Sequence, residues 1–535
     1  MTEYKADGRL RWVQALQLIE DNPQIEGIQG RLDETPITIV VAPADAGTSA
    51  AQVTALTAVN LLARLFRRII IVVPDGVAAD ARLPFVAGSL GVALVSFAER
   101  VHPTVRVALA AAPPPGSVIL HIAPFTQTTG TTAAVYCGGT GWLARVSRCP
   151  LSGSLARDDA NPIGPLVAAV LGVAELFKVV FGDLIAGIIP ADEVRFSALT
   201  HSAASDVPGP PLGAVTLPDT TLVGAGSIGS AFLWGLAHLP AIRGNLAIVD
   251  PDTLAGHNPD RAILVLDDAA TRERPKATWA RDMVKPFLPR LAVTAFEGTI
   301  RRYVDALPPD YRLPLAVSAV DSIEARRDIQ DVLPQHILNA STGPTTVQIS
   351  RHAFGDDGPC LYCLYLPEVL ERAPIRLATA RTGFPQKEVA EMLIPDSRYR
   401  LSAGNVRGIE RRNDLPPGAL GRFEGQSLQA LLADQLWYSQ APVPLADGHA
   451  LITTAFVSAL AGVLLLAETI KEAVPALAAY HLAHVYEQEL LGVPNGFVYP
   501  GERDRTGYCL CHDPLRLRLY EDKYNLSARS QGTDP

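Results

Sequence analysis

A glycine-rich turn between an apolar strand and an apolar helix most constrains how this chain can fold. The segment TTLV at residues 220–223 is predicted to be a buried strand, and a G-x-G-x-x-G turn formed by Gly224, Gly226 and Gly229 follows it directly. The run AFLWGLAHL at residues 231–239 then predicts a helix. Such glycines let the backbone approach a phosphate, and the helix N-terminus favours its negative charge. The pattern therefore predicts a nucleotide-binding α/β domain.

Polar residues after the next strand narrow the choice of nucleotide. Asp250 ends the apolar run NLAIVD, at the spacing of an acid that hydrogen-bonds ribose hydroxyls. Four further candidates follow within a short reach, namely Asp252, Asn258, Arg261 and Lys276. An enzyme that adenylates a carboxylate must neutralise a triphosphate and stabilise a pentavalent α-phosphorus, and Arg and Lys suit that task. An NAD(P)-dependent oxidoreductase would share the turn and Asp250 but needs no such cluster. Taken singly, each charge can also be an ordinary surface residue.

Another acid is predicted on the same side of the sheet. Asp321 ends the predicted strand PLAVSAVD at residues 314–321. A carboxylate in that position can hold Mg²⁺ between phosphates. The predicted site therefore combines glycines and Asp250 for the nucleotide with Asn258, Arg261, Lys276 and Asp321 for the reaction.

The chain divides into two halves of similar plan. In the first half, strands are predicted at residues 37–43, 69–75, 92–97 and 117–122, and helices at 10–19, 51–66 and 164–180. Its first βαβ turn, residues 44–50, has a single glycine and makes a poor phosphate cradle. The second half adds a strand at 336–341 and a helix at 454–473. Both late helices carry a small-residue run, then a Glu and three residues later a Lys, which favours an internal duplication over chance similarity.

A segment rich in Pro and Gly, residues 205–218, is predicted to link the halves. We expect a first domain of residues 1–210 and a second of 211–535 with an insertion at about 370–446. Residues 374–446 show no strong period and are expected to form an irregular crossover loop, a type of segment that is usually functional.

Composition excludes several classes of protein. Hydrophobic residues make up 48% of the 535 and charged residues 19%, which indicates a compact globular chain. The formal net charge of −9 disfavours a general nucleic-acid partner. The apolar stretches 165–185 and 455–470 contain charges and are expected to be buried helices, with no membrane as partner. Six cysteines suggest no disulfide framework, so we expect a reducing cytoplasm.

An ordered set of motifs resembles the ThiF, MoeB and ubiquitin-activating enzyme superfamily. The set comprises GAGSIG, IVDPDTLAGHNPDR, RPK, SAVDS and CLYC, and it covers residues 215–365 closely and 450–515 more loosely. The resemblance implies ATP and Mg²⁺ as cofactors. It also implies an α/β fold of two Rossmann-like, ThiF-type adenylation domains in a pseudo-dimer arrangement, with the first one inactive. The family often has Gln where Ala262 stands, so altered contacts but retained activity are expected there.

The inactive half of such enzymes lends an Arg from its N-terminal arm to the ATP phosphates. Arg9 and Arg11 are the candidates here, unless they are exposed helix charges.

Two short cysteine pairs predict a metal staple. Cys360 and Cys363 form C-x-x-C, and Cys509 and Cys511 form C-x-C followed by His512. Thiolates from two loops suit a tetrahedral structural Zn²⁺, and the family places such pairs at the corresponding points. Because the second pair departs from C-x-x-C, His512 is an alternative ligand, and free or redox-active thiols remain an alternative reading.

The absence of a cysteine from residues 364–508 bears on the function, because ubiquitin-activating enzymes usually carry a catalytic Cys there. Either the adenylate passes directly to a Cys on a conjugating enzyme, which we favour, or a C-terminal Cys is catalytic. Cys137 and Cys149 in the first half are expected to be ordinary thiols.

The leading hypothesis is ATP-dependent adenylation of the C-terminal carboxylate of a ubiquitin-like protein, in a bacterial conjugation system such as an antiphage system. The alternatives are adenylation of a sulfur-carrier protein or peptide C-terminus, an NAD(P)-dependent oxidoreductase and a non-catalytic scaffold. The oxidoreductase leaves Arg261, Lys276 and Asp321 unexplained, and a scaffold need not keep the cluster. An oligomer remains open.

Overall fold

The computed structural model describes residues 25–526 except for several short segments. These gaps are residue 103, 123–132, 152–157, 159, 185–187, 189, 203–208, 267–272, 344, 355–357, 367–374, 376–377, 380–381, 395–396, 413–416, 432–442, 446–447, 451–453, 484, 493–495, 506 and 508. The predicted helix at 10–19, with Arg9 and Arg11 beside it, lies outside the described residues.

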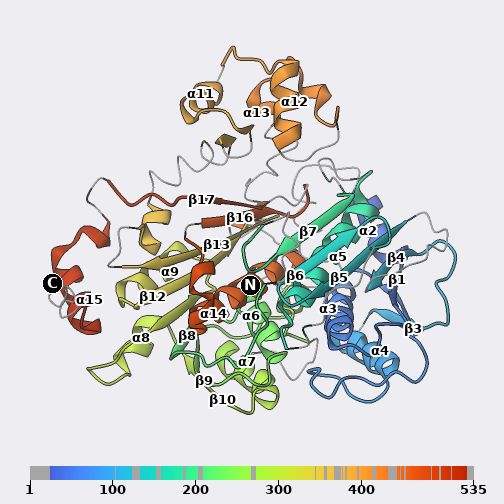
Figure 1. Ribbon diagram of the computed structural model, residues 1–535, viewed down its shortest axis with the longest axis horizontal. Coiled ribbons are helices and arrows are strands. Elements are labelled where there is room, and N and C mark those ends of the chain that lie inside the picture. Colours follow the sequence, from blue (N-terminus) through green and yellow to red (C-terminus); the bar gives the residue numbers. More distant parts are fainter. Residues whose placement is uncertain are drawn as a thin grey trace.

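The first half is a sheet with helices packed on it (Figure 1). Its strand order is β3-β2-β1-β4-β5-β6-β7, where β1 to β7 are Pro36–Val41, Arg68–Val72, Arg106–Leu109, Val118–Ile122, Ala134–Thr140, Leu143–Ser147 and Glu193–Ser197. Neighbours pair in parallel from β3 to β5 and antiparallel from there to β7. The helices are α2 (Ile25–Glu34), α3 (Ser49–Leu65), α4 (Leu90–Val101) and α5 (Ile163–Phe181).

The second half repeats this order of strands. Its sheet runs β10-β9-β8-β11-β12-β13-β16-β17, with β8 to β13 at Thr220–Val223, Gly244–Asp250, Leu291–Glu297, Leu315–Ser318, His336–Thr342 and Thr346–Ala353, and β16 and β17 at Val485–Glu489 and Gly496–Tyr499. Pairing is again parallel up to the fifth strand, β12, and antiparallel beyond it. The helices are α6 (Ser227–Ala237), α7 (Lys276–Val284), α8 (Ile300–Asp305), α9 (Ile323–Asp331), α14 (Ala455–Ala473) and α15 (Pro514–Tyr524).

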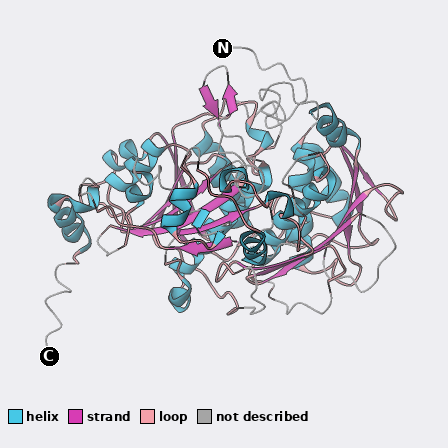
Figure 2. Ribbon diagram, turned by 90° about the horizontal axis from the view of Figure 1, so that it is seen from above, coloured by secondary structure: helices cyan, strands magenta, loops and turns pink. Residues whose placement is uncertain are grey.

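Apolar helices join the two halves into one core. Helix α14 packs on α6 and also on α5 and α3 of the first half, so a single cluster of buried side chains runs through both sheets. Figure 2 shows helices lying between and around the strands of both sheets. The predicted fold class, two Rossmann-like α/β domains in a pseudo-dimer, is therefore confirmed.

Both apolar stretches singled out in the sequence are buried helices, as expected. One described helix, α5, is long and apolar enough to cross a membrane by length and composition, and 94% of its apolar window is buried inside the molecule. Its two charges pair with each other, because Lys178 Nζ lies 2.6 Å from Glu175 Oε1.

One predicted strand is wrong. Residues 92–97, VALVSF, belong to helix α4. Leu90, Leu94, Phe97 and Val101 are buried on one face while Val92 is 56% exposed, and this spacing is helical. A six-residue window rich in Val hid that longer period.

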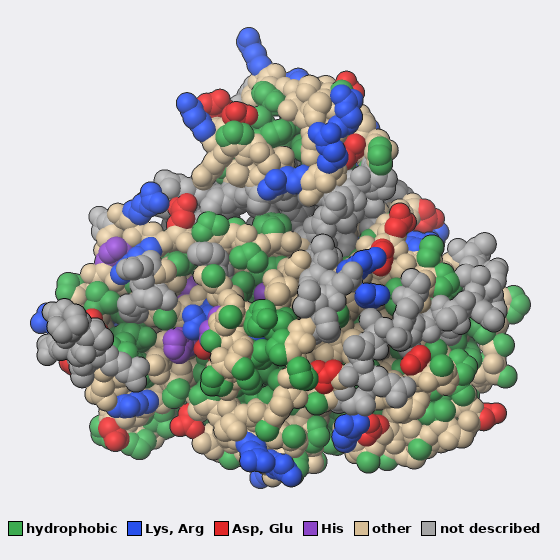
Figure 3. Space-filling model, viewed as in Figure 1, with side chains coloured by type: hydrophobic (Ala, Val, Ile, Leu, Met, Phe, Trp, Pro, Cys, Tyr) green, Lys and Arg blue, Asp and Glu red, His purple; other side chains and the backbone are tan. Residues whose placement is uncertain are grey.

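The stretch expected to be an irregular loop, residues 374–446, is also different. It contains α11 (Gln386–Met392), α12 (Ala403–Arg412), the 3₁₀ turn η5 (Gly421–Phe423) and α13 (Leu428–Leu431). These elements share a small core of their own that includes Val389, Ile409 and Leu428, and Figure 1 places them apart from both sheets. We call residues 375–431 the helical lobe. Lys and Arg side chains stand out on it in Figure 3, and Arg398 and Arg407 are among its exposed residues. Beyond the lobe, β14 (Val443–Leu445) and β15 (Gly448–Ala450) form a hairpin.

Candidate nucleotide site and cysteine cluster

The glycine turn lies at the carboxyl end of β8, in the middle of the second sheet. Gly224 adopts a φ of +97°, and a Cβ on it would stand 2.6 Å from the carbonyl oxygen of Ala319. A Cβ on Gly229 would stand 2.0 Å from the carbonyl oxygen of Gly224. A Cβ on Gly226, at the start of α6, would meet nothing within 4 Å. Gly224 and Gly229 therefore close the turn. Gly226 faces open space at a helix N-terminus, where a phosphate group would fit.

Asp250 braces this turn from the adjacent strand β9. Its carboxylate accepts hydrogen bonds from the backbone N–H groups of Ala225 at 2.6 Å and Asp252 at 2.8 Å. Burial raises the pKa of this carboxyl group, and the two N–H donors oppose that rise. Each oxygen keeps a further lone pair, so the residue can still accept from a ribose hydroxyl.

Lys276 and Asp252 meet directly. Lys276 is the first residue of α7, and its Nζ lies 2.8 Å from Asp252 Oδ2. The Lys276 side chain is only 14% exposed, whereas that of Asp252 is 64% exposed. Because the Asp252 carboxylate is exposed to solvent, this ion pair contributes little to stability, so Lys276 can exchange its partner for a phosphate at small cost.

Asn258 and Arg261 lie on the segment that connects β9 to α7. Asn258 begins a 3₁₀ turn (η1, Asn258–Asp260), and its Oδ1 accepts from the backbone N–H of Ala255 at 2.7 Å. Arg261 follows the turn and is half-buried. From Asn258 to Val265 the chain is held against both halves of the molecule, and we call these residues the crossing segment. The backbone N–H of Leu264 donates to Ser230 Oγ on α6 at 2.7 Å.

Asp321 follows β11 and does not end it, because that strand stops at Ser318. The Asp321 side chain is exposed. Since β9, β8 and β11 are parallel neighbours, their carboxyl ends meet at one edge of the sheet. The predicted residues therefore follow three adjacent strand ends, where Lys276 contacts Asp252 directly.

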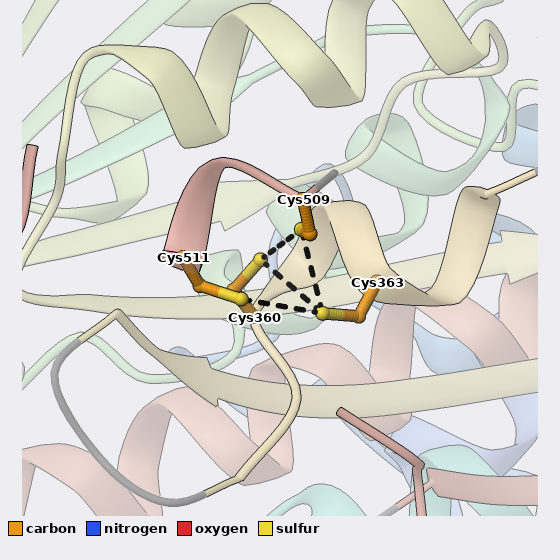
Figure 4. Close-up of side chains that lie close together, drawn as sticks. All are labelled: Cys360, Cys363, Cys509 and Cys511. Carbon is orange, nitrogen blue, oxygen red and sulfur yellow. Dashed lines mark hydrogen bonds between the residues drawn. The ribbon is translucent and has the colours of Figure 1, made fainter. Parts of the chain in front are cut away.

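The four predicted cysteines come together at one buried point (Figure 4). The Cys360 Sγ atom lies 3.7 Å from that of Cys363 and 3.4 Å from that of Cys509, and Cys363 Sγ lies 3.6 Å from that of Cys511. Four sulfurs at about 2.3 Å from one Zn²⁺ in a tetrahedron would be about 3.8 Å apart, so this set fits the ion.

Hydrogen bonding from Cys360 lowers the pKa values of Cys363 and Cys511, which favours thiolates there. The alternative ligand His512 does not join this group, and its Nε2 lies 2.6 Å from the Asp504 carbonyl oxygen.

Sequence reasoning missed three polar residues that hold the crossing segment. They are Ser230, on the glycine-turn helix, and Asn60 and Arg64, on α3 of the first half. Ser230 stands one residue after the last glycine of the motif, which was a usable signal. Asn60 and Arg64 gave no signal, because their contacts cross between the two halves.

A glycine turn at a strand end, followed directly by a helix, defines a nucleotide-binding α/β protein. Comparison with family models identifies the class further. Residues 36–189 match the BilD N-terminal domain, and residues 219–484 match the ThiF family. Residues 219–484 therefore carry a ThiF family domain, and ThiF adenylyltransferases use ATP and Mg²⁺.

A full-length relative carries no functional description. An uncharacterized protein, y4jF of Sinorhizobium fredii (strain NBRC 101917 / NGR234), is 26% identical over 509 residues, or 93% of this chain and 92% of that protein. Two crystal structures of E. coli MccB, with succinimide and with MccA-N7isoASN, are each 13% identical, with TM-scores of 0.32 and 0.31. They align with 56% and 55% of this chain, which spans 66% of each of theirs. Likenesses at that level add nothing to the family assignment.

Proposed function

We propose that this chain uses ATP and Mg²⁺ to adenylate the C-terminal carboxylate of a ubiquitin-like protein. The observation that supports the proposal is the polar connection that follows β9, the strand beside the glycine turn, and carries Asn258, Arg261 and Lys276 at the start of α7. A dinucleotide oxidoreductase has no use for this cluster, and the family assignment supports the same choice.

The reaction assigns each group a role. A carboxylate oxygen of the substrate attacks the α-phosphorus of ATP, the bond to the bridging α,β-oxygen breaks, and pyrophosphate leaves with the electron pair. Arg261 and Asn258 would stabilise charge on the pentavalent α-phosphoryl group, and Lys276 would neutralise the leaving phosphates. Asp321 would hold Mg²⁺, which supplies charge neutralisation between the phosphates when it is bound.

The product is then expected to leave by thiol transfer to a partner. A thiolate of a conjugating enzyme attacks the acyl carbon, a thioester forms and AMP departs. Residues 364–508, which include the helical lobe, contain no cysteine, and Cys360, Cys363, Cys509 and Cys511 are all buried against one another. This burial favours transfer to the partner over a covalent intermediate on this chain.

The cysteine cluster is proposed to hold a structural Zn²⁺. It would join the turn after β13 to the C-terminal segment that leads into α15. Because thiolate ligands must stay reduced, this assignment fits a cytoplasmic enzyme. Metal analysis of the purified chain should give one zinc per chain, and Cys511→Ser should lower that ratio. The exposed Cys149→Ser is the matched control.

The test of function is transfer of radioactive AMP. The chain is mixed with α-labelled ATP, Mg²⁺ and candidate small proteins from the same genome, including a sulfur carrier and any ubiquitin-like protein. We expect labelled AMP on the C-terminus of the ubiquitin-like protein and loss of the label when its last residue is amidated. Labelling of the sulfur carrier alone would support the alternative. No label on any protein, together with NAD(P) reduction, would refute adenylation. The proposed bacterial antiphage role predicts genes for the partners beside this one and loss of phage resistance in Asp321→Ala cells.

A further inference from the structure

A buried arginine of the first half reaches across to the candidate site of the second. Arg64 lies on α3 and is 1% exposed. Its Nη2 donates to the carbonyl oxygens of Ile263 and Val265, each at 2.9 Å, and its Nη1 donates to that of Pro259. Three carbonyls of the crossing segment therefore converge on one guanidinium.

Asn60 completes the arrangement from one turn earlier on the same helix. Its Oδ1 accepts from Arg64 Nε at 3.0 Å and from Nη2 at 2.8 Å. Its Nδ2 donates to the carbonyl oxygen of Ile263 at 2.9 Å. Residues four apart face the same side of a helix, so the pair presents one rigid donor surface to the crossing segment.

The segment held in this way carries two of the proposed reacting groups. Asn258 and Arg261 lie at its start, and the backbone N–H of Ala262 donates to the Asn258 carbonyl at 2.9 Å. On the opposite side Ser230 binds Leu264, and Ser230 belongs to the helix that begins at the glycine turn. The crossing segment is therefore fixed between the phosphate turn of its own half and α3 of the other.

A requirement for stability alone does not account for this choice of residue. Removing a guanidinium from water costs several kcal/mol, and an apolar side chain of similar volume is often as stable or more so. What Arg64 supplies that an apolar residue lacks is directed, charge-assisted hydrogen bonding to three carbonyls.

Resting on the function proposed above, we propose that Arg64, with Asn60, is a positioning residue: it holds the crossing segment so that Arg261 and Asn258 meet the α-phosphoryl group. A displacement of about 1 Å in such a group costs on the order of 10²-fold in rate.

The experiment compares Arg64→Met, Arg64→Lys and the wild type in the full chain. In Arg64→Met the kcat of ATP–pyrophosphate exchange should fall about 10²-fold, while Arg64→Lys, which keeps a donor, should recover part of it. Amide hydrogen exchange, measured without ATP, should rise selectively in residues 258–265 of Arg64→Met. In an Arg261→Ala background, Arg64→Met should add only the part of its loss that acts through Asn258, so the two losses should be less than additive.

The matched control is Glu175→Gln with Lys178→Met, which removes another buried cation that bonds a backbone carbonyl across the halves, that of Gly492. It should leave residues 258–265 and kcat unchanged. If Arg64→Met does not fold, Asn60→Ala replaces it and should act in the same direction.

Unchanged amide exchange in 258–265, or fully additive losses in the double variant, would overturn the positioning role. Absence of pyrophosphate exchange in the wild type with every candidate substrate would instead refute the proposed function, and the amide-exchange measurement would still decide the role of Arg64.

Discussion

The two halves of this molecule share a scaffold and differ in the loops that leave it. Each has five parallel strands and a long apolar helix, α5 or α14, and the parallel strands are followed by two antiparallel strands in the first half and three in the second. In the second half the turn after β8 is closed by Gly224 at positive φ, whereas Gly47 in the corresponding turn of the first half has nothing within 4 Å of its Cβ position. The proposed nucleotide chemistry thus depends on a few loop residues, while the scaffold of the first half forms without them.

The exchange between the halves is reciprocal but unequal. Phe85, in the segment after β2, stacks on Trp234 of α6 with ring centroids 5.2 Å apart. In the other direction, the crossing segment after β9 accepts hydrogen bonds from Asn60 and Arg64 of α3. One contact is apolar and the other is a set of directed hydrogen bonds.

The largest effect should come from the reacting groups themselves. Arg261→Ala and Asp321→Ala should each lower ATP–pyrophosphate exchange by about 10²–10³-fold, because each removes a charge from the transition state. The thermal midpoint of Asp321→Ala should stay near that of the wild type, since the side chain is exposed. Asp75→Ala, at an exposed acid that follows β2 in the first half, is the control and should keep full activity. Wild-type exchange in both second-half variants would end the distinction between the halves.

Next come the buried lysines that bind the halves together. Lys178 Nζ lies 2.6 Å from the Gly492 carbonyl oxygen, and Lys471 Nζ lies 3.0 Å from that of Leu199, so each lysine reaches the opposite half. Lys178→Met and Lys471→Met each remove the lysine partner of a buried glutamate, Glu175 or Glu468, and should lower the free energy of unfolding by about 3–5 kcal/mol. Urea denaturation measures both. The exposed Arg82→Met should cost under about 1 kcal/mol. A large loss from only one lysine would show that the duplication is not functionally symmetric.

A smaller loss of stability is expected from substitutions in the turns that follow β8 and β1. Gly224→Ala forces a Cβ against the Ala319 carbonyl at a positive φ and should cost about 2–3 kcal/mol of stability and weaken ATP binding. Gly47→Ala in the first half should be neutral in both measurements, which are thermal unfolding and ATP titration. Equal effects would mean that the first turn also holds a ligand.

The smallest predicted effect is on how the free energy of unfolding changes at acidic pH. Burial lowers the pKa of His238, at the end of α6, to about 4, and burial likewise lowers that of His121 in the first half to about 4. Each histidine therefore stays neutral in the fold but takes a proton when unfolded below about pH 6.5. The stability each contributes is complete above that pH and is lost as the pH falls toward 4.

Between pH 6.5 and 4.5, the free energy of unfolding of His238→Gln should fall by roughly 2 kcal/mol less than that of the wild type. His121→Gln should do the same for the first half. Urea denaturation across this pH range measures the slope, and an unchanged slope in either variant would contradict the assignment for that half.

Local patterns predicted the scaffold, and long-range contacts are what they could not predict. Local signals predicted the strands β1, β8 and β9, the glycine turn and the two apolar helices. These signals are the spacing of apolar residues and the position of turn residues. The strand predicted at residues 92–97 was wrong because a short apolar run fits a strand or a helix equally well. The helical lobe was not predicted because its helices are short and its core is small. The roles of Asn60 and Arg64 could not be predicted from the sequence, since both side chains donate hydrogen bonds to carbonyl groups about 200 residues away.

The cysteine cluster has a topological consequence. Cys360 and Cys509 are separated by 149 positions in sequence, and the helical lobe, the hairpin and α14 all lie between them. A cross-link across such a length removes much of the freedom of the unfolded chain, and its benefit grows only slowly with further length. Material can therefore be added to or removed from the lobe while the anchor points of the sheet stay fixed. Evolution is thus free to exchange the lobe for another insertion.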